Sequence, residues 1–232
     1  MSKLGALVVE GPPLAAEIPS LTLPQFVRHR VRGHAEKMAL VEASSGRAYT
    51  YGELDHLIGR CAAGLTALGF GLGETLVMFL PNLPEWPIVA LGAMSAGGAV
   101  SGANLMSSAS ELAYQLRDAK SRFVVTIPQF VHVVRQAVAE FDDLTTIVLG
   151  EVPQTVSFTS LLACQDPEPS PALGPDTIAA LPYSSGTSGL PKGVILTHRN
   201  IVSNICQFLQ KWKSGPSPRS RSPSCQCITS MD

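Results

Sequence analysis

The residues with the clearest potential for chemistry lie in one loop, which runs SSGTSGLPK in a sequence of 232 residues. It combines four hydroxyl side chains, two glycines and a lysine; the candidate residues are Ser184, Ser185, Gly186, Thr187, Ser188, Gly189 and Lys192. Glycines let the backbone bend so that successive N–H groups point into one concavity, which favours an anion. The lysine adds a full positive charge, because an unperturbed lysine titrates at about 10.4. Together these features predict a site for a polyphosphate.

The spacing of this loop differs from that of the Walker A phosphate loop. In that motif a Gly-Lys-Ser/Thr sequence follows four variable residues and opens a helix. Here Lys192 follows a proline and precedes Gly193, and the chain continues as an apolar, strand-like run at 194–196. The composition also leaves open a simple hairpin turn, rich in glycine and serine, with a solvated lysine.

The segments that must position the loop alternate between two patterns. Short apolar runs predict strands at 38–42, 75–80, 99–100, 122–126, 145–149 and 177–183. Helical spacing predicts helices at 50–68, 85–96, 108–119, 129–141 and 197–211. Thr50 with Glu53, and Ser108 with Glu111, form capping boxes at two of these helix starts. The alternation predicts an α/β fold with a mostly parallel sheet flanked by helices.

The composition excludes several classes of protein. Hydrophobic residues make up 45% of the sequence and charged residues 15%, which excludes a chain that is disordered over its whole length. The net charge is -1, with 17 Lys and Arg against 18 Asp and Glu, so no nucleic-acid partner is expected. The five cysteines lack the spacing of a zinc site or a disulfide framework. We therefore expect free thiols, an intracellular location and no bound metal held by the protein itself.

The uncharged stretch at 86–110 raises the question of a membrane span. It contains one proline, five serines and four glycines, and its apolar part ends near Val100. A membrane helix needs about 20 consecutive apolar residues. We therefore expect a buried helix followed by a strand, and no membrane span.

With these elements in place, the loop from Ser184 to Lys192 matches at every position the phosphate-loop signature of the adenylate-forming superfamily. The continuation GVILTHRNIVSN resembles the branch that contains acyl-CoA synthetases and 4-coumarate–CoA ligases. So do TYGELD at 50–55, the segment at 69–98 and the segment at 111–126. The resemblance covers about residues 20–208.

This resemblance implies an activity. Such enzymes join a carboxylic acid to AMP, release pyrophosphate from Mg-ATP, and pass the acyl group to coenzyme A. By resemblance, the residues from Ser184 to Gly189 wrap the β- and γ-phosphates, with Thr187 making the most direct hydroxyl contact. By the same resemblance, Lys192 is expected to stabilise the charge that grows on the leaving pyrophosphate. His198, at the start of the next helix, is expected to have a packing or capping role. The implied ligands are ATP, Mg²⁺, CoA and a carboxylic acid that the sequence does not identify.

The resemblance also divides the chain. We expect a flexible N-terminus at 1–19, a partial AMP-binding domain at 20–212 and a disordered tail rich in Ser, Pro and Arg at 213–232. In the family, the motifs for adenine, ribose and the acyl pocket follow the phosphate loop, and they are not found in this sequence. We therefore expect an incomplete N-terminal domain of the adenylate-forming fold that is inactive by itself.

The tail has two interpretations. If the reading frame of residues 225–232 is shifted by one nucleotide, the genetic code permits the sequence Leu-Pro-Val-Tyr-His-Leu-Tyr-Gly. This sequence resembles the motif that comes next in the family. A splice or frameshift origin of the tail is therefore the favoured hypothesis. The alternative is an arginine-serine segment that binds an RNA-processing partner through Arg219, Ser220, Arg221 and Ser222. A non-catalytic nucleotide-binding or regulatory fragment is a further alternative for the whole chain. The expected compartment is the cytoplasm or the peroxisome, and the oligomeric state is not predicted.

Overall fold

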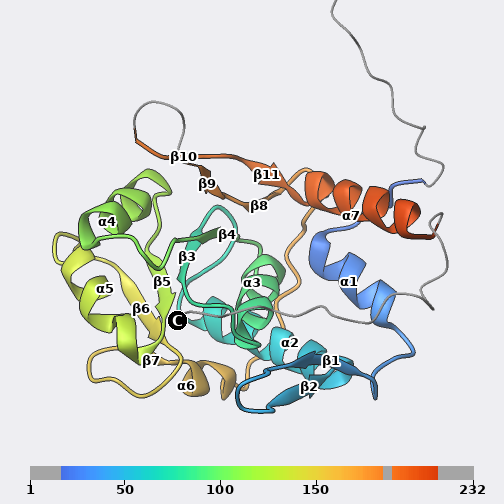
Figure 1. The fold of residues 1–232 in the computed structure, drawn as a ribbon, viewed down its shortest axis with the longest axis horizontal. Coiled ribbons are helices and arrows are strands. Elements are labelled where there is room, and N and C mark those ends of the chain that lie inside the picture. Colours follow the sequence, from blue (N-terminus) through green and yellow to red (C-terminus); the bar gives the residue numbers. More distant parts are fainter. Residues whose placement is uncertain (1–16, 185–189, 214–232) are drawn as a thin grey trace, which may run out of the picture.

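A seven-stranded sheet forms the centre of the computed structural model, which describes residues 17–184 and 190–213 (Figure 1). In spatial order its strands are β11 (Leu196–Thr197), β8 (Ile178–Ala180), β4 (Ala99–Gly102), β3 (Thr75–Phe79), β5 (Phe123–Thr126), β6 (Thr145–Val148) and β7 (Val156–Ser157). All neighbouring pairs are parallel except the edge pair β11–β8. This confirms the predicted mostly parallel α/β sheet.

Two short antiparallel pairs lie outside this sheet. One is formed by β1 (Met38–Val41) and β2 (Ala48–Thr50), and the other by β9 (Tyr183–Ser184) and β10 (Lys192–Gly193). Figure 1 shows them on opposite sides of the molecule, β9 and β10 at the top and β1 and β2 at the bottom. The second pair carries the two described ends of the candidate loop.

Helices cover both faces of the sheet (Figure 1). They are α1 (Leu23–Val31), α2 (Tyr51–Ala67), α3 (Glu85–Ser95), α4 (Ala109–Asp118), α5 (Val131–Ala137), α6 (Phe158–Leu162) and α7 (His198–Lys213), with a 3-10 turn at Pro128–Phe130. The core on one face includes residues of α2, α3 and α6, and the core on the other includes residues of α4 and α5.

The side chains of the central strand β3 explain this arrangement. Leu76 and Met78 belong to the core cluster that contains α2 and α3, whereas Val77 and Phe79 belong to the cluster that contains Leu112 of α4. Alternate residues of a strand point to opposite faces of its sheet. All five residues of β3 are buried, as a parallel strand between two helix layers requires.

Two helices begin at the predicted capping boxes. The hydroxyl of Thr50 accepts a hydrogen bond from the N–H of Glu53 at 3.2 Å, and that of Ser108 accepts one from Glu111 at 3.3 Å. Each glutamate carboxylate accepts a bond in return from the backbone N–H of its cap residue, at 2.8 and 2.7 Å. These returned bonds lower the pKa of both glutamate carboxyls. The second box sets the start of α4, which contacts the candidate loop.

The prediction of one continuous strand at 177–183 is wrong. It is divided into β8 and β9, with Leu181 and Pro182 between them. Proline has no N–H to donate to a strand ladder, so the pairing stops there and the chain moves to a different partner strand. The apolar run expected at 194–196 is also shorter, because only its last residue enters β11, while Val194 and Ile195 are exposed.

The helix expected at 129–141 is shorter than predicted. A 3-10 turn comes first, and α5 then ends at Ala137. The segment after it closes as a turn, in which the N–H of Phe141 donates to the carbonyl of Val138 at 2.9 Å. The stretch at 86–110, in contrast, forms α3 and then β4 as predicted.

Several predictions on the chain's organisation remain outside what the structure describes. Residues 1–16 and 214–232, including the arginine-serine positions 219–222, lie beyond the described ranges. Within those ranges, no helix combines the length and apolar character that crossing a membrane requires.

The packing of α2 on α6 gives a test of the fold. A Cβ added at Gly64 would lie 2.2 Å from the backbone oxygen of Leu161, which cannot move without shifting α6. We expect Gly64→Ala to lower the free energy of unfolding by about 1–3 kcal/mol through overpacking, although alanine favours a helix by about 1 kcal/mol over glycine. Urea unfolding of the purified chain measures this difference.

Gly59 of the same helix provides the matched control. The nearest atom to its added Cβ is the carboxylate end of Glu168, at 2.9 Å, which is a flexible side chain. Gly59→Ala should therefore change the free energy of unfolding by no more than about 1 kcal/mol. Equal losses in the two variants would contradict the proposed packing of α2 on α6.

Candidate functional site

The candidate loop connects the two strands of an antiparallel hairpin. Ser184 of β9 pairs with Lys192 of β10, and Tyr183 pairs with Gly193. The hairpin that the sequence offered as an alternative interpretation is therefore present at the two ends of the loop. A hairpin of this kind is compatible with an anion site, because its strands bring the two ends of the loop together. The predicted residues Ser185, Gly186, Thr187, Ser188 and Gly189 lie outside the described residues.

The two candidate residues that the structure describes face each other across the hairpin. Ser184 and Lys192 are both exposed and are register partners. An ammonium group and a hydroxyl donor at one place are the kind of donor set that phosphate oxygens accept. The structure thus brings together one predicted hydroxyl and the one predicted cation at the mouth of the loop.

The hairpin lies at the carboxyl edge of the parallel sheet. Its first strand, β9, follows β8, which runs parallel to β4. In open α/β sheets, ligands bind in the crevice outside the carboxyl ends of the strands. The position of the loop in the fold is therefore one at which ligand binding is common.

A partly buried polar network fixes the point where the chain leaves the sheet. The N–H of Leu181 donates to the carbonyl of Val100 at 2.8 Å, and the hydroxyl of Ser101 donates to the carbonyl of Leu181 at 2.6 Å. The amide of Gln115 donates to the Ser101 hydroxyl at 2.9 Å and to the Gly102 carbonyl at 3.1 Å. Ser101 and Gln115 are buried, and the polar groups of both side chains have partners, as a stable core requires. The chain therefore enters the hairpin from a fixed position.

Two further hydrogen bonds join the hairpin to α4. The hydroxyl of Tyr183 donates to Asp118 at 2.5 Å, and the hydroxyl of Tyr114 donates to the carbonyl of Pro191 at 3.1 Å. Burial, together with the bond to Asp118, raises the pKa of Tyr183 well above its ordinary value. Tyr183 therefore stays protonated and keeps its role as a donor at neutral pH.

Sequence reasoning did not identify Tyr114, Asp118 or Tyr183 as residues of this site. A signal was present, because Tyr114 and Asp118 are four residues apart within a predicted helix and so share one face of it. Nothing in that spacing names the loop as their partner, since the two bonds join residues 65 and 77 positions apart.

His198 has the packing and capping role that was expected. Its side chain is 1% exposed, and its Nδ1 accepts a hydrogen bond of 3.1 Å from the N–H of Leu23, the first residue of α1. The histidine of α7 thus caps α1. Its Nε2 is buried and has no hydrogen-bond partner in the part of the chain that the structure describes. Burial accordingly lowers the pKa of this histidine.

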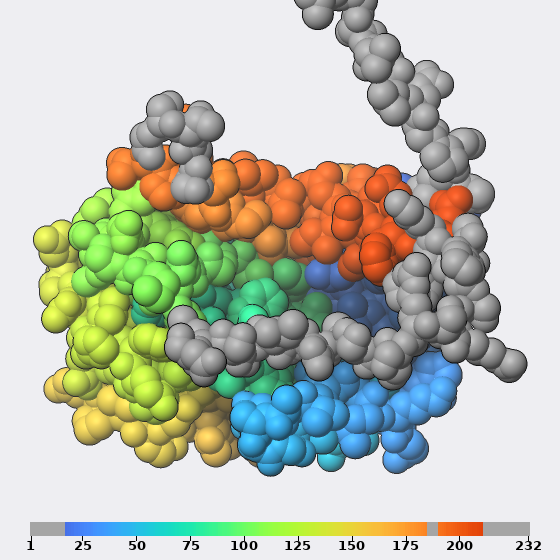
Figure 2. Space-filling model, viewed as in Figure 1, coloured from blue at the N-terminus to red at the C-terminus, as the bar shows by residue number. Residues whose placement is uncertain are grey.

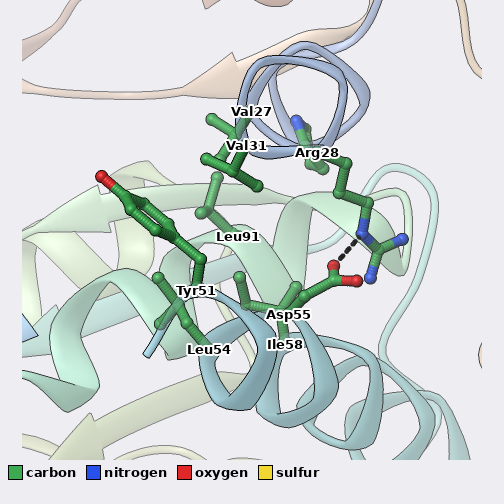
Figure 3. Close-up of a pocket in the computed structure, with 9 residues that line it drawn as sticks. Val27, Arg28, Val31, Tyr51, Leu54, Asp55, Ile58 and Leu91 are labelled. Atoms are coloured by element: carbon green, nitrogen blue, oxygen red, sulfur yellow. Dashed lines mark hydrogen bonds and ion pairs between the residues drawn. The ribbon is translucent and has the colours of Figure 1, made fainter. Parts of the chain in front are cut away.

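A hollow between α1, α2 and α3 is too small for a substrate (Figure 3). Its walls are mostly apolar, with Val27, Leu54 and Leu91 among them, and an ion pair of 2.5 Å between Arg28 and Asp55 lies at one end. The cavity holds about 10 Å³, which is close to the space that one water needs. It is therefore a packing gap between helices.

Two further kinds of side chain that could do chemistry are metal ligands and cysteine thiols. No group of three or more His, Cys, Asp or Glu side chains is close enough there to hold a metal ion. The described cysteines are free thiols, and burial raises the pKa of Cys61 to about 12. A thiol with so high a pKa is not a nucleophile at neutral pH.

The burial of His198 makes stability depend on pH, because it lowers the pKa of the side chain in the folded chain. Because the folded pKa is lowered, the unfolded chain takes up a proton first as pH falls below about 6.5. Stability is therefore complete above that pH and falls below it, by up to about 1.4 kcal/mol per pH unit. We expect His198→Asn, which keeps an acceptor but does not titrate, to lose less stability between about pH 7.5 and pH 5.5.

Urea unfolding at the two pH values measures this effect. His132, whose ring lies at an exposed position near the carbonyl of Gln129, provides the control, and His132→Asn should keep the pH dependence of the unchanged chain. The assignment of the pH effect to His198 would be overturned if both variants behaved alike.

The chain is similar to known proteins over most of its length. The family described as AMP-binding enzyme matches residues 27–226. The 4-coumarate–CoA ligase-like 1 of Arabidopsis thaliana is 42% identical over 195 residues, which are 82% of this chain and 35% of the relative. The 4-coumarate–CoA ligase 3 of Oryza sativa subsp. japonica is 36% identical over 188 residues, covering 81% of this chain and 34% of the relative.

Solved structures give the same result. A benzoate CoA ligase from Burkholderia xenovorans LB400 matches with a TM-score of 0.70 and 28% identity, over 79% of this chain and 36% of that one. The N-terminal domain of FACL13 from Mycobacterium tuberculosis matches with a TM-score of 0.68 and 29% identity, over 76% and 44%. The chain spans about a third of the length of the curated relatives it matches. On these matches and on its fold, the chain belongs to the AMP-binding enzyme family, the adenylate-forming superfamily.

Proposed function

We propose that this chain supplies the phosphate-binding part of a ligase that activates a carboxylic acid with ATP and transfers the acyl group to coenzyme A. The observation that carries the proposal is the hairpin with Ser184 and Lys192 at its mouth, at the carboxyl edge of the parallel sheet. Its support is membership of the AMP-binding enzyme family and similarity to proteins named as 4-coumarate–CoA and benzoate CoA ligases.

In this proposal the loop grips the triphosphate. Residues 184–189 donate hydroxyl and backbone N–H groups to the β- and γ-phosphates, with Thr187 as the most direct hydroxyl contact. Lys192 donates to a phosphate oxygen and stabilises the negative charge that accumulates on pyrophosphate as it leaves. ATP, when bound, supplies the adenylyl group for the carboxylate and pyrophosphate as the leaving group. Mg²⁺ is proposed to arrive with the phosphates and to share their charge.

We also propose that these 232 residues bind nucleotide without completing the reaction when assayed alone. The chain spans about a third of the relatives that are named as CoA ligases, so the proposed carboxylate and CoA sites draw on more of the fold than the described residues. Carboxylate-dependent exchange of pyrophosphate into ATP by the purified chain would contradict this.

Replacement of the lysine tests the phosphate site. We expect Lys192→Ala to weaken binding of inorganic tripolyphosphate by about tenfold or more, because a charge-assisted bond at the mouth of the loop is lost. Isothermal titration at low ionic strength measures the dissociation constant. The loss should shrink as salt is added, since exposed charges are screened.

Lys37 provides the matched control for this measurement. It lies next to β1, on the opposite side of the molecule from the hairpin (Figure 1). Lys37→Ala removes the same charge from the chain and should leave the dissociation constant unchanged. Equal binding by the Lys192→Ala variant and the original chain would refute the phosphate site.

A further inference from the structure

Both described ends of the candidate loop are held by one helix. Asp118, the last residue of α4, accepts the hydrogen bond from Tyr183 at 2.5 Å, and Tyr114, one turn earlier, donates to the carbonyl of Pro191 at 3.1 Å. Tyr183 lies directly before Ser184, and Pro191 directly before Lys192. Each bond is therefore made one residue away from a proposed phosphate ligand.

The surface of the molecule shows the same contact. In Figure 2 the orange surface of the hairpin strands lies against the light-green surface of α4. The ring of Tyr183 also lies under the opposite strand, where a Cβ added at Gly193 would be 3.1 Å from the ring carbon Cζ. A side chain at position 193 would force the ring to shift, so glycine fits this approach best.

Helix α4 is itself a rigid support. Leu112 and Leu116 are fully buried in the core on one face of the sheet. Gln115 bonds to the end of β4, and Ser108 caps the start of the helix. Tyr114 and Asp118 thus extend toward the hairpin from a helix that is fixed at its core face and at its first turn.

We propose that Tyr114 and Asp118 are positioning residues, which hold the two ends of the loop at the spacing that a polyphosphate requires. This inference rests on the proposed function, because it assigns the loop a phosphate ligand. The physical basis is preorganisation: ends that are already fixed lose less conformational freedom when a ligand binds. Neither residue needs to touch the ligand for this effect.

Binding of tripolyphosphate to the full chain tests the proposal. We expect Tyr183→Phe and Asp118→Ala each to weaken binding about three- to tenfold. Tyr114→Phe should also weaken binding. The double variant Tyr183→Phe/Asp118→Ala should be no weaker than either single variant, because one bond is removed in all three. Asp118→Asn, which still accepts a hydrogen bond, should recover part of the loss.

Tyr49→Phe is the matched control. Tyr49 donates to the carboxylate of Glu85 at 3.1 Å, so this variant removes a similar bond, between β2 and α3. It should leave the dissociation constant unchanged. Equal binding by the original chain, Tyr183→Phe and Asp118→Ala would overturn the positioning role, and so would fully additive losses in the double variant.

A second measurement needs no ligand and separates the two proposals. Hydrogen exchange of peptides covering residues 190–194 should become faster in Asp118→Ala and Tyr183→Phe, and stay unchanged in Lys192→Ala and Tyr49→Phe. Unchanged exchange in the first two variants would overturn the positioning role even if tripolyphosphate does not bind. Absence of tripolyphosphate binding by the original chain, with faster exchange in these variants, would refute only the phosphate site.

Discussion

Burial of both faces of the parallel sheet is the constraint on which the rest of this structure depends. Strand β3 is buried along its whole length and sends alternate side chains into two separate cores. Parallel strands need crossover connections, and the crossing helices must then cover both faces. This requirement places α2 and α3 on one side and α4 on the other, and it leaves the carboxyl edge to loops. The candidate hairpin lies at that edge.

Helix α4 links the core to the hairpin because its faces carry different residue types. Leu112 and Leu116 pack on the sheet, Gln115 bonds to the end of β4, and Tyr114 and Asp118 reach the hairpin. The same packing that stabilises the fold thus fixes the position of the loop ends. Stability and ligand geometry are coupled here through a single element.

The polar residues inside the fold follow from the same topology. The chain leaves the sheet after Ala180, the last residue of β8, and the carbonyl of the half-buried Leu181 needs a donor there. The hydroxyl of Ser101, supported by Gln115, supplies it. His198 has a comparable role at the start of α7, where it accepts a hydrogen bond from the first N–H of α1. These groups are buried because each satisfies backbone that the fold would otherwise leave unpaired.

The sequence by itself determined the alternation of strands and helices, the capping boxes at Thr50 and Ser108, and the glycine- and hydroxyl-rich loop with Lys192. These are local patterns, because a helix cap or a strand period is specified by residues within a few positions of one another. Only the tertiary structure decided which strands β8 and β9 pair with. It also decided the partners of α4, since those bonds join residues 65 and 77 positions apart. The contact between Leu23 and His198 spans 175 positions. No local pattern encodes such pairs, because they exist only after the two faces of the sheet have been covered.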